Sequence, residues 1–249
     1  MSKVKIGIIG TGVGIRTHLK GFRLCEDADI IAICGSSKVR SQEFADKYSI
    51  PVACADYKEL CDISDIDLVC VTSPNRYHLS AVKYAIEKGK HIICEKPLSD
   101  EISEVYEIVN CSKKIDKIAV VDHQLRYNPY IQKIKELIDN NEIGRVYSVK
   151  LNQQGTGFAN TTADWCWSFD GKQGGGVRLA MASHFTDLIQ YWFNNRKVIS
   201  INGFLNPVTK QRQDKEGNLH NIDASTICAA QINLVDELCV QYYINAGSY

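Results

Sequence analysis

Short apolar runs rich in β-branched residues alternate with helix-like periodicity through the first half of the 249-residue chain. Uninterrupted apolar runs are typical of strands buried on both faces, and apolar residues three or four positions apart are typical of helices. The predicted strands cover residues 4–9, 30–34, 67–72, 91–94 and 117–122. The predicted helices cover residues 15–22, 42–48 and 77–88, and a further one starts at an N-cap, Ser99, with Ile102, Val105 and Val109 as its apolar stripe. This alternation predicts an α/β fold with a doubly wound parallel sheet covered by helices on both faces.

The pattern changes near His123. Pro129 fits the first turn of a helix, and another helix is predicted over residues 183–193. The other apolar segments, at 146–153, 198–205, 224–233 and 238–245, are predicted strands, most of them joined by short turns. Such strands favour antiparallel pairing. We therefore expect two domains, residues 1–122 and residues 123–249, the second an α+β domain with a largely antiparallel sheet.

Composition narrows the class of protein. The formal net charge is zero, which argues against a general nucleic-acid or anionic-membrane binder. The chain shows no signal peptide and no apolar run approaching the roughly 20 residues that cross a bilayer. Its 10 cysteines are scattered singly, several of them inside apolar strands. They indicate buried thiols in a reducing compartment, and hence a soluble cytoplasmic protein.

The first predicted strand runs directly into Gly10-Thr11-Gly12-Val13-Gly14-Ile15 and then into a helix. This order is typical of the corner that cradles a dinucleotide. Gly10 permits the tight turn, Gly12 lets a pyrophosphate approach the backbone, and free N–H groups at the helix start hold the anion. Ile15 occupies the position at which the dinucleotide-binding motif has a third small residue. The alternative interpretation of this segment is an ordinary turn before a helix.

Further segments make the chain resemble the Gfo/Idh/MocA family of NAD(P)-dependent sugar and cyclitol oxidoreductases. The resemblance covers essentially the whole chain. In order, its motifs are Gly10 to His18, Val71 to His78, Cys94-Glu95-Lys96-Pro97-Leu98, Asp122 to Pro129 and Gly174 to His184. The resemblance implies an NAD(P)-binding Rossmann domain over residues 1–122, a domain for substrate binding and oligomerisation over 123–249, and a cis peptide before Pro97.

Ligands of open parallel sheets bind beyond the carboxyl ends of the strands, where the segments after residues 71 and 94 lie. The expected cofactor-binding residues are Gly10, Gly12, Val13, Gly14, Ile15, Ser36, Ser37, Thr72, Ser73, Pro74, Asn75, His78, Glu95 and Lys96. No metal site is expected. By resemblance Lys96 and His184 are the catalytic pair, because a desolvated lysine holds a forming alkoxide and a histidine exchanges protons near neutral pH. The alternatives are a surface lysine and a capping or core histidine.

The expected substrate-binding residues are His123, Arg126, Trp165 and His184. Arg126 fits an interdomain salt bridge equally well, and Trp165 fits simple packing. Many family members carry an aspartate four residues before the histidine, where this chain has Ala180. Asp187 also matches a family aspartate, which serves catalysis or only anchors its helix.

The segment after the second strand decides the expected cofactor. NAD binders place an acid there to hold the ribose 2′-hydroxyl, whereas this chain has Gly35-Ser36-Ser37-Lys38-Val39-Arg40. Hydroxyls and cations suit a 2′-phosphate, so the sequence favours NADP over NAD; the alternative is an exposed basic turn.

Family members continue through further strands and a closing helix, whereas this chain stops at Tyr249. Leaving the apolar segment Leu238-Cys239-Val240 on an open edge is unfavourable. We therefore expect a truncated form or a homo-oligomer formed through the C-terminal sheet. The predicted function is an NAD(P)-dependent dehydrogenase or reductase for a secondary hydroxyl or ketone of a small sugar-like molecule. The rival hypothesis is a non-catalytic nucleotide-binding sensor, which Ala180 and the short C-terminus motivate.

Overall fold

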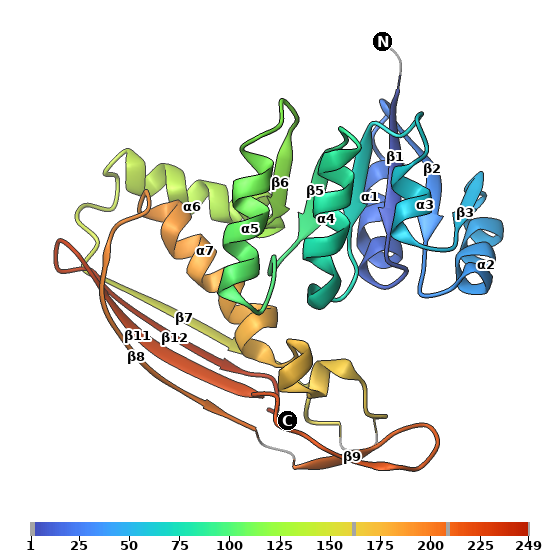
Figure 1. Cartoon of the computed structure of the whole chain (residues 1–249). Helices are drawn as coiled ribbons and strands as arrows, with labels where there is room; N and C mark the ends of the chain where they lie inside the picture. The colour runs from blue at the N-terminus through green and yellow to red at the C-terminus, as the bar shows by residue number, and fades with distance from the viewer. Residues whose placement is uncertain (1–2, 161–162, 208–209, 249) are drawn as a thin grey trace. The chain divides into compact units, whose positions relative to one another are not determined.

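The computed structural model of the protein describes residues 3–160, 163–207 and 210–248. The chain forms two compact units, Met1–Asp122 and His123–Tyr249 (Figure 1). Each unit has its own sheet and its own apolar core.

The first unit contains a six-stranded sheet in the order β3-β2-β1-β4-β5-β6. Its strands are β1 (Val4–Ile9), β2 (Ala28–Cys34), β3 (Val52–Cys54), β4 (Leu68–Val71), β5 (His91–Glu95) and β6 (Ala119–Asp122). All neighbouring strands are parallel. The strand order reverses between β1 and β4, which makes their carboxyl ends the binding edge of a doubly wound fold. The predicted sheet is confirmed.

Helices cover both faces of this sheet. They are the π-helical turn η1 (Gly14–His18), α1 (Leu19–Arg23), α2 (Lys38–Tyr48), α3 (Tyr57–Cys61), the 3-10 turn η2 (Asn75–Tyr77), α4 (His78–Glu87) and α5 (Ile102–Ser112). Buried apolar side chains of η1, α1 and α2 form one core cluster with β1 and β2. Those of α3, α4 and α5 form a second cluster with the same sheet. Two separate clusters are what a sheet buried on both faces requires.

The start of α5 differs from the prediction. The helix begins at Ile102 with Glu101 as its N-cap, and the Ser99 hydroxyl instead accepts a hydrogen bond from the Glu101 N–H at 3.0 Å. Ile102, predicted as part of the buried stripe, is 71% exposed, and Ile108 is the buried residue of the helix. The serine forms a turn before the helix, so the helix starts later than the capping pattern suggested. The short β3 and α3 were not predicted.

The second unit contains a four-stranded sheet in the order β7-β12-β11-β8 and a separate two-stranded ribbon, β10-β9. Its strands are β7 (Ser148–Gln154), β8 (Val198–Asn206), β9 (Gln211–Gln213), β10 (Leu219–Asn221), β11 (Ile227–Leu234) and β12 (Cys239–Asn245). Three of its helices are α6 (Pro129–Asp139), the π-helical turn η6 (Arg178–Ala182) and α7 (Ser183–Trp192). Its 3-10 turns are η3 (Gln124–Tyr127), η4 (Trp167–Phe169) and η5 (Gly171–Gln173).

This sheet is mixed rather than wholly antiparallel. β11 pairs antiparallel with β8 and β12, but β12 pairs parallel with β7. β12 is therefore an interior strand, and the expectation that Leu238-Cys239-Val240 borders an open edge is wrong. Local turns could not reveal this because β7 comes from a segment far earlier in the chain. The edges are β7 and β8.

Helices α6 and α7 pack on one face of the second sheet. Leu188, Ile189 and Trp192 of α7 form the core with Ile232 and Val240, and the Trp192 indole donates a hydrogen bond to the Ile131 carbonyl at 3.2 Å. In the described part of this unit no helix covers the opposite face, as Figure 1 shows. That face is hollowed over about 440 Å³ and is lined by residues such as Lys150, Gln231 and Tyr243.

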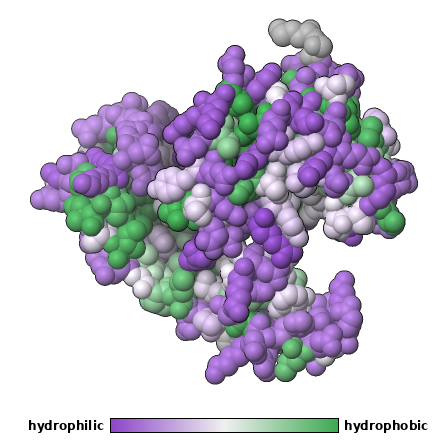
Figure 2. All heavy atoms as spheres, in the orientation of Figure 1, coloured by the Kyte–Doolittle hydropathy of each residue, from purple (hydrophilic) through white to green (hydrophobic). Residues whose placement is uncertain are grey.

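The cysteines are free and mostly buried, as their positions in the sequence predicted. All 10 cysteines are free, and 6 of them are buried, including Cys34, Cys70 and Cys94 as predicted. Figure 2 shows polar side chains interspersed with small apolar groups on the face in view. Among the described residues, no helix combines the length and the apolar character needed to cross a bilayer.

Arg212 supports the loop before η4 and generates a stability prediction. It is 3% exposed, and its guanidinium donates hydrogen bonds to the carbonyls of Phe158, Asn160 and Ala163 while stacking over the Phe169 ring. Arg212→Met leaves buried carbonyls without donors, so we expect the free energy of unfolding to fall by about 3 kcal/mol. Urea unfolding measures the loss. Lys210→Met, which removes an exposed cation nearby, is the control and should change stability little; equal losses in both variants contradict the prediction.

Candidate active site

The glycine turn after β1 is held by Thr72. Gly10 has a φ of +112°, and a Cβ on it would lie 2.5 Å from the Thr72 Oγ1. The Thr72 hydroxyl reaches the Ile9 carbonyl at 2.8 Å and the Gly10 carbonyl at 3.3 Å. Glycine is therefore required at position 10 by both conformation and space. Thr72, expected among the cofactor-binding residues, is buried and secures the turn with its hydroxyl.

Gly12 and Gly14 occupy opposite environments. A Cβ on Gly12 would meet nothing within 4 Å, so the backbone of Gly12 faces open space. A Cβ on Gly14 would instead lie 2.5 Å from the Thr72 Oγ1 and 2.8 Å from the Ile8 Cγ2. Gly14 thus provides the close helix–strand packing that the fingerprint assigns one residue later. Ile15 is instead buried in the apolar core, and Val13 is half-buried. The helix opens with the π-helical turn η1, so its side-chain register differs from that of an α-helical start.

The turn after β2 is joined to the glycine turn by Arg40. Ser37 is the N-cap of α2 and accepts from the Arg40 N–H at 3.2 Å, and Ser36 is exposed. The Arg40 Nε donates to the Thr11 Oγ1 at 3.1 Å. Lys38 lies apart from this group, because its amine bonds the Ala53 carbonyl at 2.5 Å. The turn therefore offers hydroxyls and one cation close to the glycine motif.

The loops after β4 and β5 are linked by His78. Its Nε2 lies 2.8 Å from the Ser73 carbonyl oxygen, and its Nδ1 lies 3.1 Å and 3.2 Å from the carbonyl oxygens of Pro97 and Leu98. His78 is fully buried, and burial lowers the pKa of its imidazole. His78 thus connects the two loops, and its expected contact with a cofactor stays a prediction.

The loop after β4 fits a bound cofactor. The Ser73 hydroxyl is buried and finds no hydrogen-bond partner within the described part of the chain. Pro74 precedes η2, and Asn75, its first residue, is also buried. A polar atom enclosed without a partner is unfavourable unless a ligand supplies one. Together with the open backbone at Gly12, this supports the fit of a dinucleotide along the β1–β4 edge.

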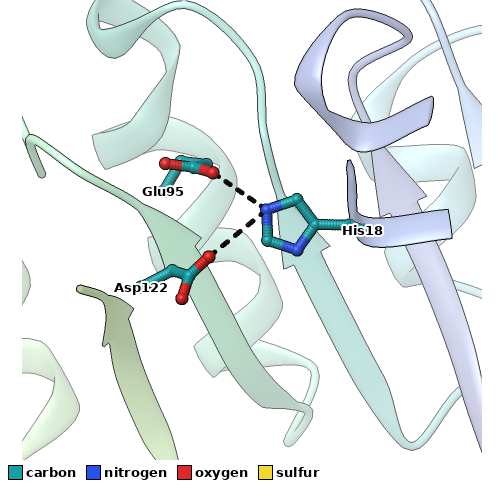
Figure 3. Close-up of side chains that lie close together, drawn as sticks. All are labelled: His18, Glu95 and Asp122. Carbon is teal, nitrogen blue, oxygen red and sulfur yellow. Dashed lines mark hydrogen bonds and ion pairs between the residues drawn. The ribbon is translucent and has the colours of Figure 1, made fainter. Parts of the chain in front are cut away.

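Glu95, an expected cofactor-binding residue at the end of β5, forms a cluster with His18 and Asp122, which were not expected in the site. Figure 3 shows His18 between Glu95 and Asp122, with its Nε2 2.9 Å from Glu95 Oε1 and 3.4 Å from Asp122 Oδ2. His18 ends η1, and Asp122 ends β6. Asp122 ends a neighbouring parallel strand just as Glu95 does, so the strand-end rule could have identified it. No such rule indicated His18.

Lys96 follows Glu95, and the Lys96–Pro97 peptide is cis, as the family resemblance implied. The Lys96 backbone N–H donates to Glu95 Oε2 at 3.1 Å. Burial lowers the pKa of the Lys96 amine from its ordinary 10.5, although the charges of Glu95 and Asp122 oppose the shift. A less basic amine can hold or exchange a substrate proton.

His184, the other predicted catalytic residue, lies in the first turn of α7 and is buried. Its ring meets the His123 ring edge-on, with the centroids 6.0 Å apart. Asp187, one turn later, accepts hydrogen bonds from the Arg126 Nε at 2.8 Å and from its Nη2 at 2.5 Å. His123 Nε2 lies 3.7 Å from the same carboxylate.

These contacts join the chain after β6 to α7. Asp187 raises the pKa of Arg126. Arg126 forms its salt bridge with Asp187 inside the second unit, so the expectation of an interdomain salt bridge is wrong. Ala180, in η6, is exposed.

Trp165 lies apart from this group in the second unit. Its indole stacks on the imidazole of His220 with the ring centroids 4.4 Å apart, and His220 Nε2 lies 2.7 Å from Asp214 Oδ2. The hydrogen bond with His220 is the main reason why the pKa of Asp214 is lowered to about 2. The structure thus supplies a partner for one face of Trp165 from β10.

Comparison with known proteins identifies the class of both units. Residues 4–123 match the oxidoreductase family with an NAD-binding Rossmann fold, Gfo/Idh/MocA, and residues 131–245 match the C-terminal domain of that family. The chain therefore belongs to the Gfo/Idh/MocA oxidoreductase family.

Particular relatives fit this class. The chain is 25% identical to an uncharacterised oxidoreductase of Synechocystis over 98% of its own length and 66% of the relative's. It is 28% identical to myo-inositol 2-dehydrogenase of Thermotoga maritima over 76% of its length and 54% of the relative's. The structure of levoglucosan dehydrogenase with NADH and L-sorbose superposes with a TM-score of 0.93 at 21% identity, covering 99% of this chain and 68% of that one. The chain thus spans about half to two thirds of the length of these curated relatives.

The contrast between Gly12 and Gly14 yields a prediction. Gly14→Ala forces a methyl group against Thr72 and Ile8, so we expect the free energy of unfolding to fall by about 1–3 kcal/mol. Gly12→Ala should leave stability nearly unchanged but weaken dinucleotide binding, because its methyl group points where a pyrophosphate approaches. Thermal unfolding and calorimetric titration with NADPH and NADH separate the two effects. Equal stability loss in both variants contradicts the assignment.

Proposed function

We propose that the protein is an NAD(P)-dependent dehydrogenase or reductase acting on a secondary hydroxyl or ketone of a sugar, cyclitol or related small molecule. The observation that carries the proposal is the half-buried Lys96, whose amine has a pKa lowered by burial. Lys96 follows β5, the strand next to β4, and the loop after β4 holds the Ser73 hydroxyl, which has no hydrogen-bond partner among the described residues. Relatives named as myo-inositol 2-dehydrogenase and D-glucoside 3-dehydrogenase support the substrate class.

The chemistry assigns distinct tasks to the protein's residues. A bound nicotinamide supplies the hydride acceptor or donor. The open backbone at Gly12 and the start of η1 receive the pyrophosphate, and Ser73 and Asn75 orient the nicotinamide end. Lys96 holds the substrate oxygen as negative charge develops on it, and His184 takes the hydroxyl proton during oxidation or returns it during reduction. His123, Arg126 and Trp165 belong to the proposed substrate side.

We assign NADP as the preferred cofactor. The turn after β2 carries Ser36, Ser37 and Arg40, with no carboxylate between Gly35 and Arg40. A ribose 2′-phosphate needs a cation and hydroxyl donors, whereas a free 2′-hydroxyl is usually bound by an acid. The Arg40 guanidinium is already positioned by its hydrogen bond to Thr11.

The second unit also supports an interaction between copies of the chain. One sheet face lacks a helix in the described residues, and Phe204 and Leu205 of the edge strand β8 are more than half exposed. We propose a homo-oligomer formed through this sheet, as exposed apolar side chains on an edge favour pairing. The buried free thiols support a cytoplasmic location.

A non-catalytic nucleotide sensor is the second candidate, and Ala180 is the observation that favours it. The position offers no carboxylate to orient His184. Both candidates require dinucleotide binding, so only turnover separates them.

Lys96→Met tests the enzyme proposal. A panel of sugars and cyclitols and their ketones, followed at the absorbance of the reduced nicotinamide, first identifies a substrate. Removing the amine should then lower turnover by about 10²–10⁴-fold while the cofactor dissociation constant stays nearly constant. Lys20→Met, at an exposed lysine of α1, is the control. Normal turnover in Lys96→Met removes Lys96 from the mechanism, and silence of the wild-type protein across the panel with tight cofactor binding favours the sensor.

Arg40→Ser tests the cofactor preference. Losing a charge-assisted contact with the 2′-phosphate should raise the dissociation constant of NADPH by about tenfold or more and leave that of NADH almost unchanged. Lys47→Ser, near the other end of α2, is the matched control because it removes an exposed cation from the same helix. Fluorescence titration provides both constants. A parallel loss of affinity for both nucleotides speaks against a 2′-phosphate contact.

A further inference from the structure

Asp122 lies at the carboxyl edge of the first sheet, beside Glu95. β6 pairs with β5 in parallel register, and Asp122 is the direct partner of Glu95 in this pairing. Side chains at matching positions of neighbouring strands project from the same face of a sheet. Figure 3 shows both carboxylates turned toward the His18 ring. The ends of the two strands thus present two carboxylates side by side.

Each oxygen of the Glu95 carboxylate already has a protein partner. Glu95 Oε1 lies 2.9 Å from the His18 Nε2, and Glu95 Oε2 accepts a hydrogen bond from the Lys96 N–H at 3.1 Å. The side chain of Glu95 is 10% exposed. Protein contacts therefore hold this carboxylate in place and leave little of it accessible to a ligand.

The Asp122 carboxylate, in contrast, keeps its capacity to accept hydrogen bonds. Its Oδ2 lies 3.4 Å from the His18 Nε2, but that nitrogen carries at most one proton and lies closer to Glu95. Among the described residues, no group donates a hydrogen bond to this carboxylate. The side chain of Asp122 is 21% exposed, about twice the fraction of Glu95. Asp122 is thus a reachable acceptor without a donor.

The pKa of Asp122 agrees with this lack of donors. It is raised by burial first and by the charge of Glu95 second, and the charges of His18 and Lys96 do not cancel these effects. Burial acts on Glu95 in the same direction, but hydrogen bonds from His18 and the Lys96 N–H, together with their charges, leave its pKa lowered. A ligand that donates a hydrogen bond to Asp122 would therefore stabilise its ionised form.

The strand order indicates which part of a dinucleotide comes near Asp122. In a doubly wound fold the pyrophosphate lies at the glycine turn after β1, and the adenosine ribose lies at the turn after β2. β2 is on one side of β1 in the sheet, whereas β4, β5 and β6 are on the other side. The nicotinamide half therefore extends toward the strand ends that carry Glu95 and Asp122.

We propose that Asp122 is a further cofactor-binding residue of this chain, whose carboxylate accepts a hydrogen bond from a ribose hydroxyl group in the nicotinamide half of the dinucleotide. The inference rests on the proposed function for the identity of the ligand. A hydroxyl group that donates to an ionised carboxylate forms a charge-assisted hydrogen bond, which is stronger than one between neutral groups. Enzymes that use NAD bind the adenosine ribose through a carboxylate in the same way.

Calorimetric titration of Asp122→Ala tests the contact without any substrate. The dissociation constant of NADPH should rise by about tenfold or more, because a charge-assisted hydrogen bond is lost. The dissociation constant of adenosine 2′,5′-bisphosphate should stay nearly constant, because this fragment contains the adenosine half of NADPH and no nicotinamide ribose. Asp116→Ala, which removes an exposed acid from the loop before β6, is the matched control and should leave both constants unchanged.

Two analogues of NADPH, with 2-deoxyribose or 3-deoxyribose at the nicotinamide end, separate a direct contact from a general effect of charge. The wild type should bind one of them more weakly than NADPH, by about the factor lost in Asp122→Ala. The variant should bind that analogue and NADPH equally, because the partner of the missing hydroxyl group is already gone. Asp122→Asn nearly keeps the shape of the side chain and serves if the alanine variant fails to fold. Its amide oxygen is a weaker acceptor, so its loss of NADPH affinity should be intermediate.

Three results would overturn the role of Asp122. They are an unchanged affinity of Asp122→Ala for NADPH, an equal loss of affinity for adenosine 2′,5′-bisphosphate, and binding of both deoxyribose analogues by the wild type as tightly as NADPH. A protein that binds NADPH through Asp122 but turns over no sugar or cyclitol refutes the proposed dehydrogenase function and leaves this contact standing. Turnover combined with an unchanged NADPH affinity in Asp122→Ala refutes the contact alone.

Discussion

The contact between Thr72 and the glycine turn is the constraint on which the first unit depends. The Thr72 hydroxyl reaches the Ile9 and Gly10 carbonyls, and the space around it admits no Cβ at position 10 or 14. This contact joins the ends of β1 and β4, the two strands between which the sheet order reverses. The opening for a dinucleotide thus depends on a side chain that packs against backbone. A larger residue at either glycine would separate the strands that form the binding edge.

Most of the fold of the first unit could be predicted because its signals are local. Each apolar run formed a parallel strand, and each helical stripe formed a covering helix, since a sheet buried on both faces leaves little ambiguity in its pattern. The prediction failed where the decisive interaction was not local. The parallel pairing of β12 with β7 depends on a distant segment. The late start of α5 is a local exception: the Ser99 hydroxyl accepts a hydrogen bond from the Glu101 N–H and donates one to the Glu104 carboxylate, and the capping pattern alone does not distinguish this arrangement from an N-cap.

The candidate site shows the same division between local and non-local information. Strand-end position and family resemblance indicated Glu95, Lys96 and Ser73, but residue types alone could not tell that Gly14, rather than a residue at position 15, would be packed against Ile8. His18 was overlooked because a histidine one turn into a helix has no distinguishing pattern until Glu95 and Asp122 are placed beside it. In the second unit, His123 and Arg126 meet Asp187 through contacts that span many residues. Sequence patterns therefore indicate which strand ends carry chemistry, and tertiary packing decides how those groups act on one another.

The brace formed by His78 constrains how this protein can change over evolutionary time. Three carbonyl oxygens, from Ser73, Pro97 and Leu98, share one enclosed imidazole, so the segments after β4 and β5 have a common pivot. An insertion or deletion in either segment would displace the other, and both would have to change in concert to preserve the pivot. At the far margin of the sheet, around the short β3, the corresponding tie is the exposed Lys38 amine, which bonds the Ala53 carbonyl and lies 3.4 Å from Glu59. A flexible, exposed lysine accommodates variation in loop length more easily than an enclosed imidazole. New specificities should therefore arise in this scaffold mainly through side-chain replacement near the pivot and through length changes elsewhere.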